Sequence, residues 1–250
     1  MALHIIGIGL WDEKDITVKG LELVRSATVV YLESYTSLLS VPISTLEAFY
    51  QKKVIPADRF FVENHGDEIV EQARASDVAF LVIGDPFGAT THMDLVLRAR
   101  QQAVKVNIIN NASILTAIGI VGLSLYKFGR TVSIPFSDAQ PPDTPYLALA
   151  ENRKAGLHTL LLLDIQADKK RFMTVSEAAQ YLLAAEARLG HGVATDKTMV
   201  VACARIGGDA AIRYIPLGKV PSFDLGGPLH CMIVPGDLHF LEEDALKGWV

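Results

Sequence analysis

The chain has 250 residues, half of them hydrophobic, and a formal net charge of −5 at pH 7. At ~100–200 residues per domain, this length predicts one large domain or two modest ones, with enough core to fold without cross-links. The acidic balance excludes a general electrostatic attraction to nucleic acid, and two cysteines are too few for a disulfide scaffold.

The first half alternates short apolar strand patterns with helical patterns. Continuous Val/Ile/Leu strands between helices predict a mostly parallel sheet that is covered on both faces. In the first helix, Val18, Leu21 and Val24 recur at three-residue spacing, with Asp15 or Thr17 as the cap. The expected strands are 3–8, 28–32, 79–83 and 104–109, and the expected helices are 15–27, 43–51, 67–76 (opened by two acids) and 92–103.

The second half has several strand patterns close together, which predict a mixed or antiparallel α+β domain. One long helix is expected over 175–190, with Thr174 as its cap. The segment 135–146 contains four prolines and is predicted to be irregular, as an interdomain linker or as a loop within the second domain. The expected strands are 131–134, 158–163, 198–206, 212–217 and 229–234.

Polar and glycine-rich loops follow several predicted strands: "GIGLWDEKD", "GDPFGATTH", "NNASI" and the "LDI" at 163–165. The carboxyl ends of parallel strands share one edge of a sheet, so these loops are expected to converge where open α/β folds bind ligands. Asp85 can accept hydrogen bonds from loop amides or from a ligand amine. Ser113 can cap the next helix while its amide faces the ligand. Taken singly, each feature also fits an ordinary turn or cap.

Other chemistries have little support in the residue pattern. "GIGLWD" has two glycines of a dinucleotide fingerprint but Asp12 in place of the third. The histidines are scattered, so no metal site is predicted, and no phosphate-binding loop or nucleophile elbow occurs. His92 is a possible base, although a polar contact at a helix start is the favoured role. His230, inside an apolar strand, is expected to be a satisfied core histidine.

Location is predicted from the same patterns. The longest apolar stretch, "ASILTAIGIVGLSLY", is interrupted by glycines and hydroxyls and falls short of the ~20 apolar residues of a membrane span. The N-terminus lacks the basic flank and apolar segment of a signal peptide. We expect a cytoplasmic protein with no membrane or direct nucleic-acid contact, in which Cys203 and Cys231 are buried free thiols.

Three segments, "IIGIGLWDEKDITVKGLELVRSATVVYLESYTS", "VIGDPFGATTHMDLVLRAR" and "NIINNASILTAIGIVGLSLYKFGRTVSIPF", closely resemble the diphthine synthase family. This family lies within the tetrapyrrole-methylase-like group of S-adenosylmethionine methyltransferases, which shares the GxG and GDP loops. "YLESYTS", "GDPFGATTH" and "LYKFGRTVSIPF" are more specific to diphthine synthases. The similarity continues through "HTLLLLDIQ", "VVACARIGG" and "PLHCMIVPGDLHFLEE".

The resemblance implies a homodimer of two-domain α/β subunits. The N-terminal α/β domain would be 1–112 and the C-terminal α+β domain 113–250, with the cofactor in the cleft between them. The implied cofactor is S-adenosylmethionine, which leaves as S-adenosylhomocysteine. The carried-over cofactor contacts, of which the last three lie in shorter motifs, are Leu10, Asp85, Gly88, Ser113, Ile114, Leu163, Ile206 and His230.

The implied reaction is repeated methylation of the amine of a 3-amino-3-carboxypropyl group on a histidine of translation elongation factor 2. Three transfers give diphthine, and the eukaryotic version adds a fourth on the carboxylate. The compact loops and short C-terminus favour the three-methyl form. No catalytic base is assigned, because holding the two reactants in line supplies much of the rate.

Further hypotheses concern the substrate. Tyr35, Phe87 or Tyr126 could line a pocket for the growing ammonium, although ordinary packing is the favoured role of each. The cations Lys127, Arg130, Arg153 and Lys154 are candidates for docking elongation factor 2. The rival functions are a corrin or tetrapyrrole-ring methyltransferase of the same fold, a nicotinamide-dependent oxidoreductase and a non-catalytic binding module.

Overall fold

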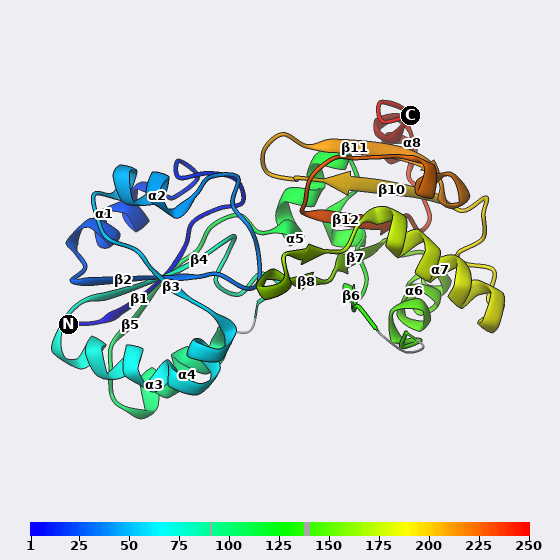
Figure 1. The fold of residues 1–250 in the computed structure, drawn as a ribbon. Coiled ribbons are helices and arrows are strands. Elements are labelled where there is room, and N and C mark those ends of the chain that lie inside the picture. The colour runs from blue at the N-terminus through cyan, green and yellow to red at the C-terminus, as the bar shows by residue number, and fades with distance from the viewer. Residues whose placement is uncertain (91, 138–140) are drawn as a thin grey trace. The chain divides into compact units, whose positions relative to one another are not determined.

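The computed structural model describes residues 1–90, 92–137 and 141–250. The chain divides into two compact units, Met1–Ala117 and Ile118–Val250. Each unit has its own sheet and its own hydrophobic core (Figure 1). Each unit is therefore described by itself below.

The first unit is built on a five-stranded sheet in the order β3-β2-β4-β1-β5. All neighbouring strands run parallel, which confirms the predicted parallel sheet. The short strand β3 was not expected, since its three residues "IPA" include a proline and lie at the sheet edge. The strands are β1 (Leu3–Gly7), β2 (Val29–Glu33), β3 (Ile55–Ala57), β4 (Val78–Val82) and β5 (Val106–Ile109).

Helices cover both faces of this sheet. Figure 1 shows α1 and α2 on one face and α3 and α4 on the other. Two separate clusters of buried apolar side chains fill the spaces under these helix pairs. The helices are α1 (Val18–Ser26), α2 (Ile43–Tyr50), α3 (Arg59–Ala75), α4 (Met93–Gln101) and the short α5 (Ile114–Ala117).

Two helix predictions in this unit need correction. Thr17, one of the two expected caps, does accept the Gly20 N–H, but Val18 is 76% exposed and does not belong to the apolar stripe. Helix α3 begins at Arg59 and is capped by Asp58, so the predicted opening at the two acids 67 and 68 is wrong. Gly66 lowers helix propensity and hid the first turns. It lies near Leu95 of α4, where a Cβ would be 3.7 Å from Leu95 Cδ1.

The second unit has a five-stranded sheet in the order β11-β10-β12-β7-β6. Its β6–β7 pair is parallel and the other pairs are antiparallel, so the predicted mixed sheet is confirmed. Cys203 and Cys231 lie opposite each other on β10 and β12 as buried free thiols, as expected. The strands are β6 (Val132–Ile134), β7 (Thr159–Leu163), β10 (Met199–Ala204), β11 (Ala211–Pro216) and β12 (His230–Val234), with a separate hairpin of β8 (Ile165–Gln166) and β9 (Arg171–Phe172).

The described helices of the second unit are α6 (Thr144–Lys154), α7 (Val175–Leu189) and α8 (Phe240–Lys247). Thr174 caps α7 as predicted, in a reciprocal capping box with Glu177. The proline-rich segment lies within this unit, and its last residues begin α6, so the expectation of irregular structure through residue 146 is wrong. Pro145 is tolerated in the first turn, where its missing N–H would have no helical partner. Residues 138–140 of that segment lie outside the described residues.

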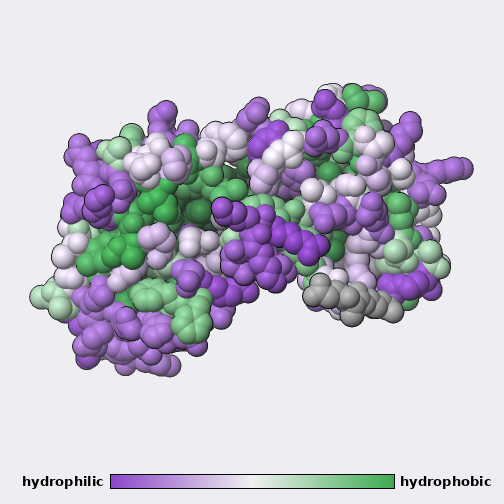
Figure 2. Space-filling model, in the orientation of Figure 1, coloured by the Kyte–Doolittle hydropathy of each residue, from purple (hydrophilic) through white to green (hydrophobic). Residues whose placement is uncertain are grey.

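None of the helices in the described ranges is both long and apolar enough to cross a membrane. Figure 2 shows hydrophilic residues over the outer helices α3 and α4 of the first unit, on the side away from its sheet. These helices are therefore amphipathic, with charged outer faces and a buried row that includes Ile69, Val70, Leu95 and Val96.

Candidate cofactor site

The loops that follow β1, β4 and β5 leave the same edge of the first sheet, because these strands are parallel neighbours. The predicted convergence of "GIGLWDEKD", "GDPFGATTH" and "NNASI" is therefore confirmed for this unit. The "LDI" segment follows β7 in the second unit, so its predicted place at the same edge is wrong. The strand before it, 158–163, was correctly assigned to the second half of the chain, so grouping this segment with the first three loops did not follow from that assignment.

The "GIGLWD" loop is closed by main-chain bonds and one carboxylate. Gly9 and Gly84 pair across the loops, and both have φ values that favour glycine, +79° and +86°. The Oδ2 of Asp15 accepts the N–H groups of Leu10 at 3.2 Å and Trp11 at 2.8 Å. Asp12 accepts the Lys14 N–H and so forms a local turn. The loop is a compact turn rather than a damaged dinucleotide fingerprint.

Asp85 connects the loops after β4 and β5. Its Oδ1 accepts the Phe87 N–H at 2.9 Å, and its Oδ2 accepts the Asn111 N–H and the Asn110 side-chain amide, both at 3.0 Å. The prediction that this carboxylate accepts loop amides is confirmed. Because both of its oxygens accept hydrogen bonds from the protein, the main structural effect of the Asp85 carboxylate is to fix the conformation of these two loops.

Asn111 is a site residue to which the sequence assigned no role. Its Nδ2 donates to the Gly7 carbonyl at 3.0 Å and to the Asp15 carbonyl at 2.9 Å, while its Oδ1 accepts the Ala112 N–H at 2.7 Å. One side chain thus joins the end of β1, the first loop and the third loop. Its partners are main-chain atoms, which no residue pattern reveals.

Gly88, Ser113 and Leu10 lie close together around Gly84. A Cβ at Gly88 would come within 2.4 Å of Ser113 Cβ, so the two loops touch there. A Cβ at Gly84 would lie 3.5 Å from Leu10 Cδ2 and 4.0 Å from Ser113 Cα. The Ser113 N–H donates to Thr116 Oγ1, so this amide is already partnered in the first turn of α5 instead of being free for a ligand.

The predicted contacts of the second unit meet at one end of its sheet. Leu163 is the last residue of β7, and His230 is the first residue of β12, opposite Ala204 at the end of β10. Leu162 pairs with Cys231, which places Leu163 beside His230. Ile206 follows β10 after one residue and is buried. The predicted cofactor contacts of each unit therefore lie close to one another within that unit.

His230 has hydrogen-bond partners on both ring nitrogens. The Val175 N–H, which can only donate, points to Nδ1 at 3.2 Å. Nε2 lies 3.1 Å from the carbonyls of Gly226 and Gly227 and so carries the proton that they accept. The predicted hydrogen-bond satisfaction of His230 is confirmed, but the residue is only partly buried, so its predicted place in the core is wrong.

His92 is buried, and neither ring nitrogen has a hydrogen-bond partner among the described residues. The expected polar contact at the start of α4 is therefore wrong. Burial lowers the pKa of the imidazole to about 4, against a weak opposing effect of the Pro86 carbonyl. With 2% of its surface exposed, His92 does not face solvent in this structure as a proton acceptor would.

The segments "YLESYTS" and "GDPFGATTH" meet at Tyr35 and His92, whose ring centres are 6.2 Å apart. Glu33 is fully buried and accepts the N–H groups of Tyr35 and Thr36 and the Thr36 hydroxyl, which fixes the loop after β2. Burial raises the pKa of Glu33 and, with the Glu33 charge, raises the pKa of Tyr35 to about 12. The Arg59 guanidinium lies over the Tyr35 ring at 5.4 Å, so that ring already has a cation as partner.

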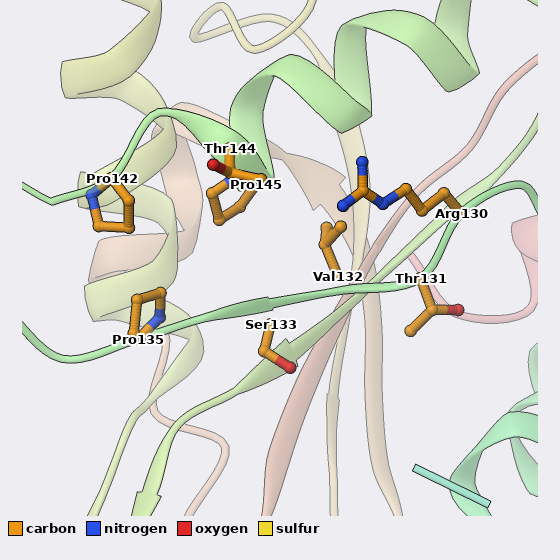
Figure 3. A pocket seen from close by; sticks show the side chains of 8 residues that line it. All are labelled: Arg130, Thr131, Val132, Ser133, Pro135, Pro142, Thr144 and Pro145. Atoms are coloured by element: carbon orange, nitrogen blue, oxygen red, sulfur yellow. The ribbon is translucent and has the colours of Figure 1, made fainter.

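A separate hollow of about 320 Å³ lies in the second unit, between β6 and the start of α6 (Figure 3). None of the predicted cofactor contacts lines it. Within the described ranges, no group of His, Cys, Asp and Glu side chains is arranged to hold a metal ion. The described residues that line the hollow are Arg130, Thr131, Val132, Ser133, Pro135, Pro142, Thr144 and Pro145.

Comparisons with known proteins identify the family and the class of enzyme to which the chain belongs. The family model described as Tetrapyrrole (Corrin/Porphyrin) Methylases matches residues 2–214. The chain belongs to this family, and its class of enzyme is methyltransferase.

Individual relatives are more specific. The chain is 47% identical to a diphthine methyl ester synthase of Bos taurus, over 98% of this chain and 94% of the other. It is 44% identical to a diphthine synthase of Methanococcus maripaludis, over 98% and 97%. A crystal structure of a diphthine synthase matches with a TM-score of 0.91 at 37% identity, over 100% of this chain and 96% of the other. The fold expected from the sequence is confirmed.

Proposed function

We propose that this chain is a diphthine synthase. It transfers methyl groups from S-adenosylmethionine to the amine of the 3-amino-3-carboxypropyl group on a histidine of translation elongation factor 2, and three transfers give diphthine. The observation that carries the proposal is 44% and 47% identity, across 98% of the chain, to relatives named for diphthine chemistry. No observation favours the corrin-ring methyltransferase or the nicotinamide-dependent oxidoreductase.

The loops fit a cofactor that is bound mainly through main-chain atoms. At Gly7 a Cβ would come within 2.6 Å of the Gly84 carbonyl, and at Gly9 within 2.2 Å of Asp15 Cβ, so side chains are excluded from these positions. We propose that Leu10, Asp85, Gly88, Ser113 and Ile114 hold S-adenosylmethionine together with Leu163, Ile206 and His230. The proposed domain limits are 1–112 and 113–250.

When bound, the cofactor supplies the electrophilic methyl carbon and a neutral thioether leaving group. The protein holds the amine in line with that carbon, and such orientation is worth ~7–11 kcal/mol of barrier lowering. The amine nitrogen forms the new C–N bond with its lone pair as the C–S bond breaks. Before each transfer the amine has to lose a proton to expose this lone pair, and water accepts that proton, since His92 is buried.

Docking of elongation factor 2 is proposed at cations of the second unit whose side chains have no hydrogen-bond partner among the described residues. The Lys127 ammonium binds Glu242 Oε2 at 2.5 Å and the Asp237 carbonyl at 2.7 Å, and Arg153 donates to the Pro235 carbonyl. These contacts argue against two of the four sequence candidates. Arg130 and Lys154 are exposed and remain proposed docking residues. A homodimer in the cytoplasm is proposed as the working form.

The test is incubation of the protein with S-adenosylmethionine and elongation factor 2 that carries the unmethylated side chain. Intact-mass spectrometry should show successive methyl-sized increments on the modified histidine, ending at three. Elongation factor 2 without the 3-amino-3-carboxypropyl group is the matched control and should gain none. Cofactor binding without transfer would contradict the proposal. A fourth increment that is lost in mild alkali would identify an additional methyl ester instead.

A further inference from the structure

Arg205 occupies a strained position at the end of β10. Its φ is +52°, in the left-handed region that residues with a Cβ seldom adopt. Such strain persists only where surrounding contacts hold it. Its N–H donates to the Leu229 carbonyl at 2.8 Å, and its carbonyl accepts the Gly208 N–H at 3.2 Å. Arg205 is therefore held by the main chain on both sides.

The guanidinium of Arg205 joins two loops. Its Nε donates to the Asp209 carbonyl at 3.0 Å, in the loop between β10 and β11. Its Nη1 donates to the carbonyls of Leu225 at 2.7 Å and Gly227 at 2.8 Å, in the segment before β12. Hydrogen bonds from a charged donor are stronger than those between neutral groups, so these three contacts hold the two loops firmly.

His230 binds the same carbonyl segment from the neighbouring strand. Its Nε2 contacts the carbonyls of Gly226 and Gly227, so the Gly227 carbonyl is shared with Arg205. Gly226 packs directly on the guanidinium, since a Cβ there would lie 3.1 Å from Arg205 Nη1. The two side chains together fix residues 225–227, and Ile206 is bonded directly to Arg205.

We infer that Arg205 is a positioning residue for cofactor binding: its guanidinium sets the geometry of Ile206 and His230, and S-adenosylmethionine binds to that geometry. Arg205 acts through these residues and is not itself a catalytic residue. The inference rests on the proposed function, because it takes these two residues as cofactor contacts.

The experiment compares wild type with Arg205→Gln, Arg205→Lys and Arg205→Gly by titration calorimetry with S-adenosylhomocysteine. We expect Arg205→Gln to raise the dissociation constant at least tenfold and the lysine variant to recover part of the loss. Arg205→Gly relieves the strained φ but removes the guanidinium, so its affinity should fall like that of the glutamine variant. Arg213→Lys on β11, whose exposed side chain donates to the adjacent Ile212 carbonyl, is the matched control and should bind as wild type does.

A merely structural role would lower thermal stability and leave the affinity of the folded fraction unchanged. Without the guanidinium, the segments that it holds should open more often, so hydrogen exchange of folded Arg205→Gln should be faster in residues 206–210 and 225–229 and unchanged elsewhere. In steady-state methylation, the KM for S-adenosylmethionine should rise more than kcat falls. Wild-type affinity in folded Arg205→Gln would overturn this inference alone. Absence of binding by wild type would overturn the proposed function and the inference together.

Discussion

The main chains of Gly9 and Gly84 exchange hydrogen bonds in both directions, with N···O distances of 3.3 Å and 2.7 Å. This pair joins the loop after β1 to the loop after β4 with no side chain between them. The approach is possible because both residues adopt a left-handed φ. The candidate site of the first unit is therefore shaped by backbone, and substitutions that add a single methyl group test it.

We expect Gly9→Ala to destabilise the protein more than Gly84→Ala. Both pay about 1–2 kcal/mol for a left-handed φ. At Gly9 the added Cβ would also lie 2.2 Å from Asp15 Cβ, whereas at Gly84 the nearest heavy atom is 3.5 Å away. Urea midpoints for the two variants measure the difference. Equal midpoints would show that Asp15 does not restrict this position.

Asp85→Asn should weaken both folding and cofactor binding. The new amide nitrogen would face N–H donors that now bond to a carboxylate oxygen, and an unsatisfied group of this kind costs about 1–3 kcal/mol. The same exchange at Asp94 is the control, because its 2.7 Å ion pair with Arg98 is on the surface and is worth under ~1 kcal/mol. Chemical unfolding and calorimetry with S-adenosylhomocysteine report the two effects. A stable Asp85→Asn variant with wild-type affinity would count against the role given to this carboxylate.

Lowering the pH should destabilise the protein because it protonates the Glu242 carboxylate. Burial alone would raise the pKa of this carboxyl, but the His239 and Ser124 N–H groups, Lys127 and His158 hold it well below the usual 4.5. A lowered folded-state pKa adds stability above the unfolded-state pKa, and that contribution is lost as the pH falls. We therefore expect the free energy of unfolding to decrease as the pH is lowered below about 5.

Glu242→Gln tests this source of acid sensitivity. It should cost about 1–3 kcal/mol near neutral pH, since the partly buried Lys127 ammonium loses its anionic partner and the buried His158 ring loses a charged hydrogen-bond acceptor. Its stability should then fall less steeply with acid than that of wild type. Glu243→Gln, one residue further and exposed, is the control and should follow the wild-type pH curve. Parallel curves for wild type and Glu242→Gln would rule out Glu242 as the source.

His92→Phe should stabilise the protein and preserve methyl transfer. The ring packs against Phe80 at 5.5 Å and Tyr35 at 6.2 Å, and its nitrogens lack described partners, so removing them should gain about 1–3 kcal/mol. The folded-state pKa of about 4 lies below the usual 6.5, so the unfolded chain binds more protons between those values. Wild type should lose up to about 3 kcal/mol as the pH falls through that window, and the variant should not. Loss of methyl transfer in a folded variant would restore His92 as a proton acceptor.

Several elements could be predicted because their signals are local. The Val/Ile/Leu strands β1, β4 and β5 predicted the parallel sheet, and the glycines and Asp85 at their ends marked the loops of the candidate site. Thr174 predicted the start of α7, where the structure adds a capping box with Glu177. In each case the residues that carry the signal are adjacent or nearly adjacent in the chain.

The missed features depend on partners that are distant in the chain. Asn111 acts through the Gly7 carbonyl, 104 residues away, and Arg205 through the carbonyls of Leu225 and Gly227. A carbonyl is present in every residue, so the sequence does not mark which one is used. The start of α3 was obscured by Gly66, which lies beside Leu95 of α4, although a Cβ at this position would make only ordinary van der Waals contact.

The contact between Gly88 and Ser113 limits which pairs of residues these positions can hold. Because a Cβ at residue 88 would come within 2.4 Å of Ser113 Cβ, glycine is required at one of the two positions while the loops keep this spacing. Gly88→Ala and Ser113→Gly should therefore be strongly non-additive, with the second change recovering much of the stability lost to the first. The two positions are therefore coupled: while the loops keep this spacing, a Cβ gained at residue 88 has to be given up at residue 113.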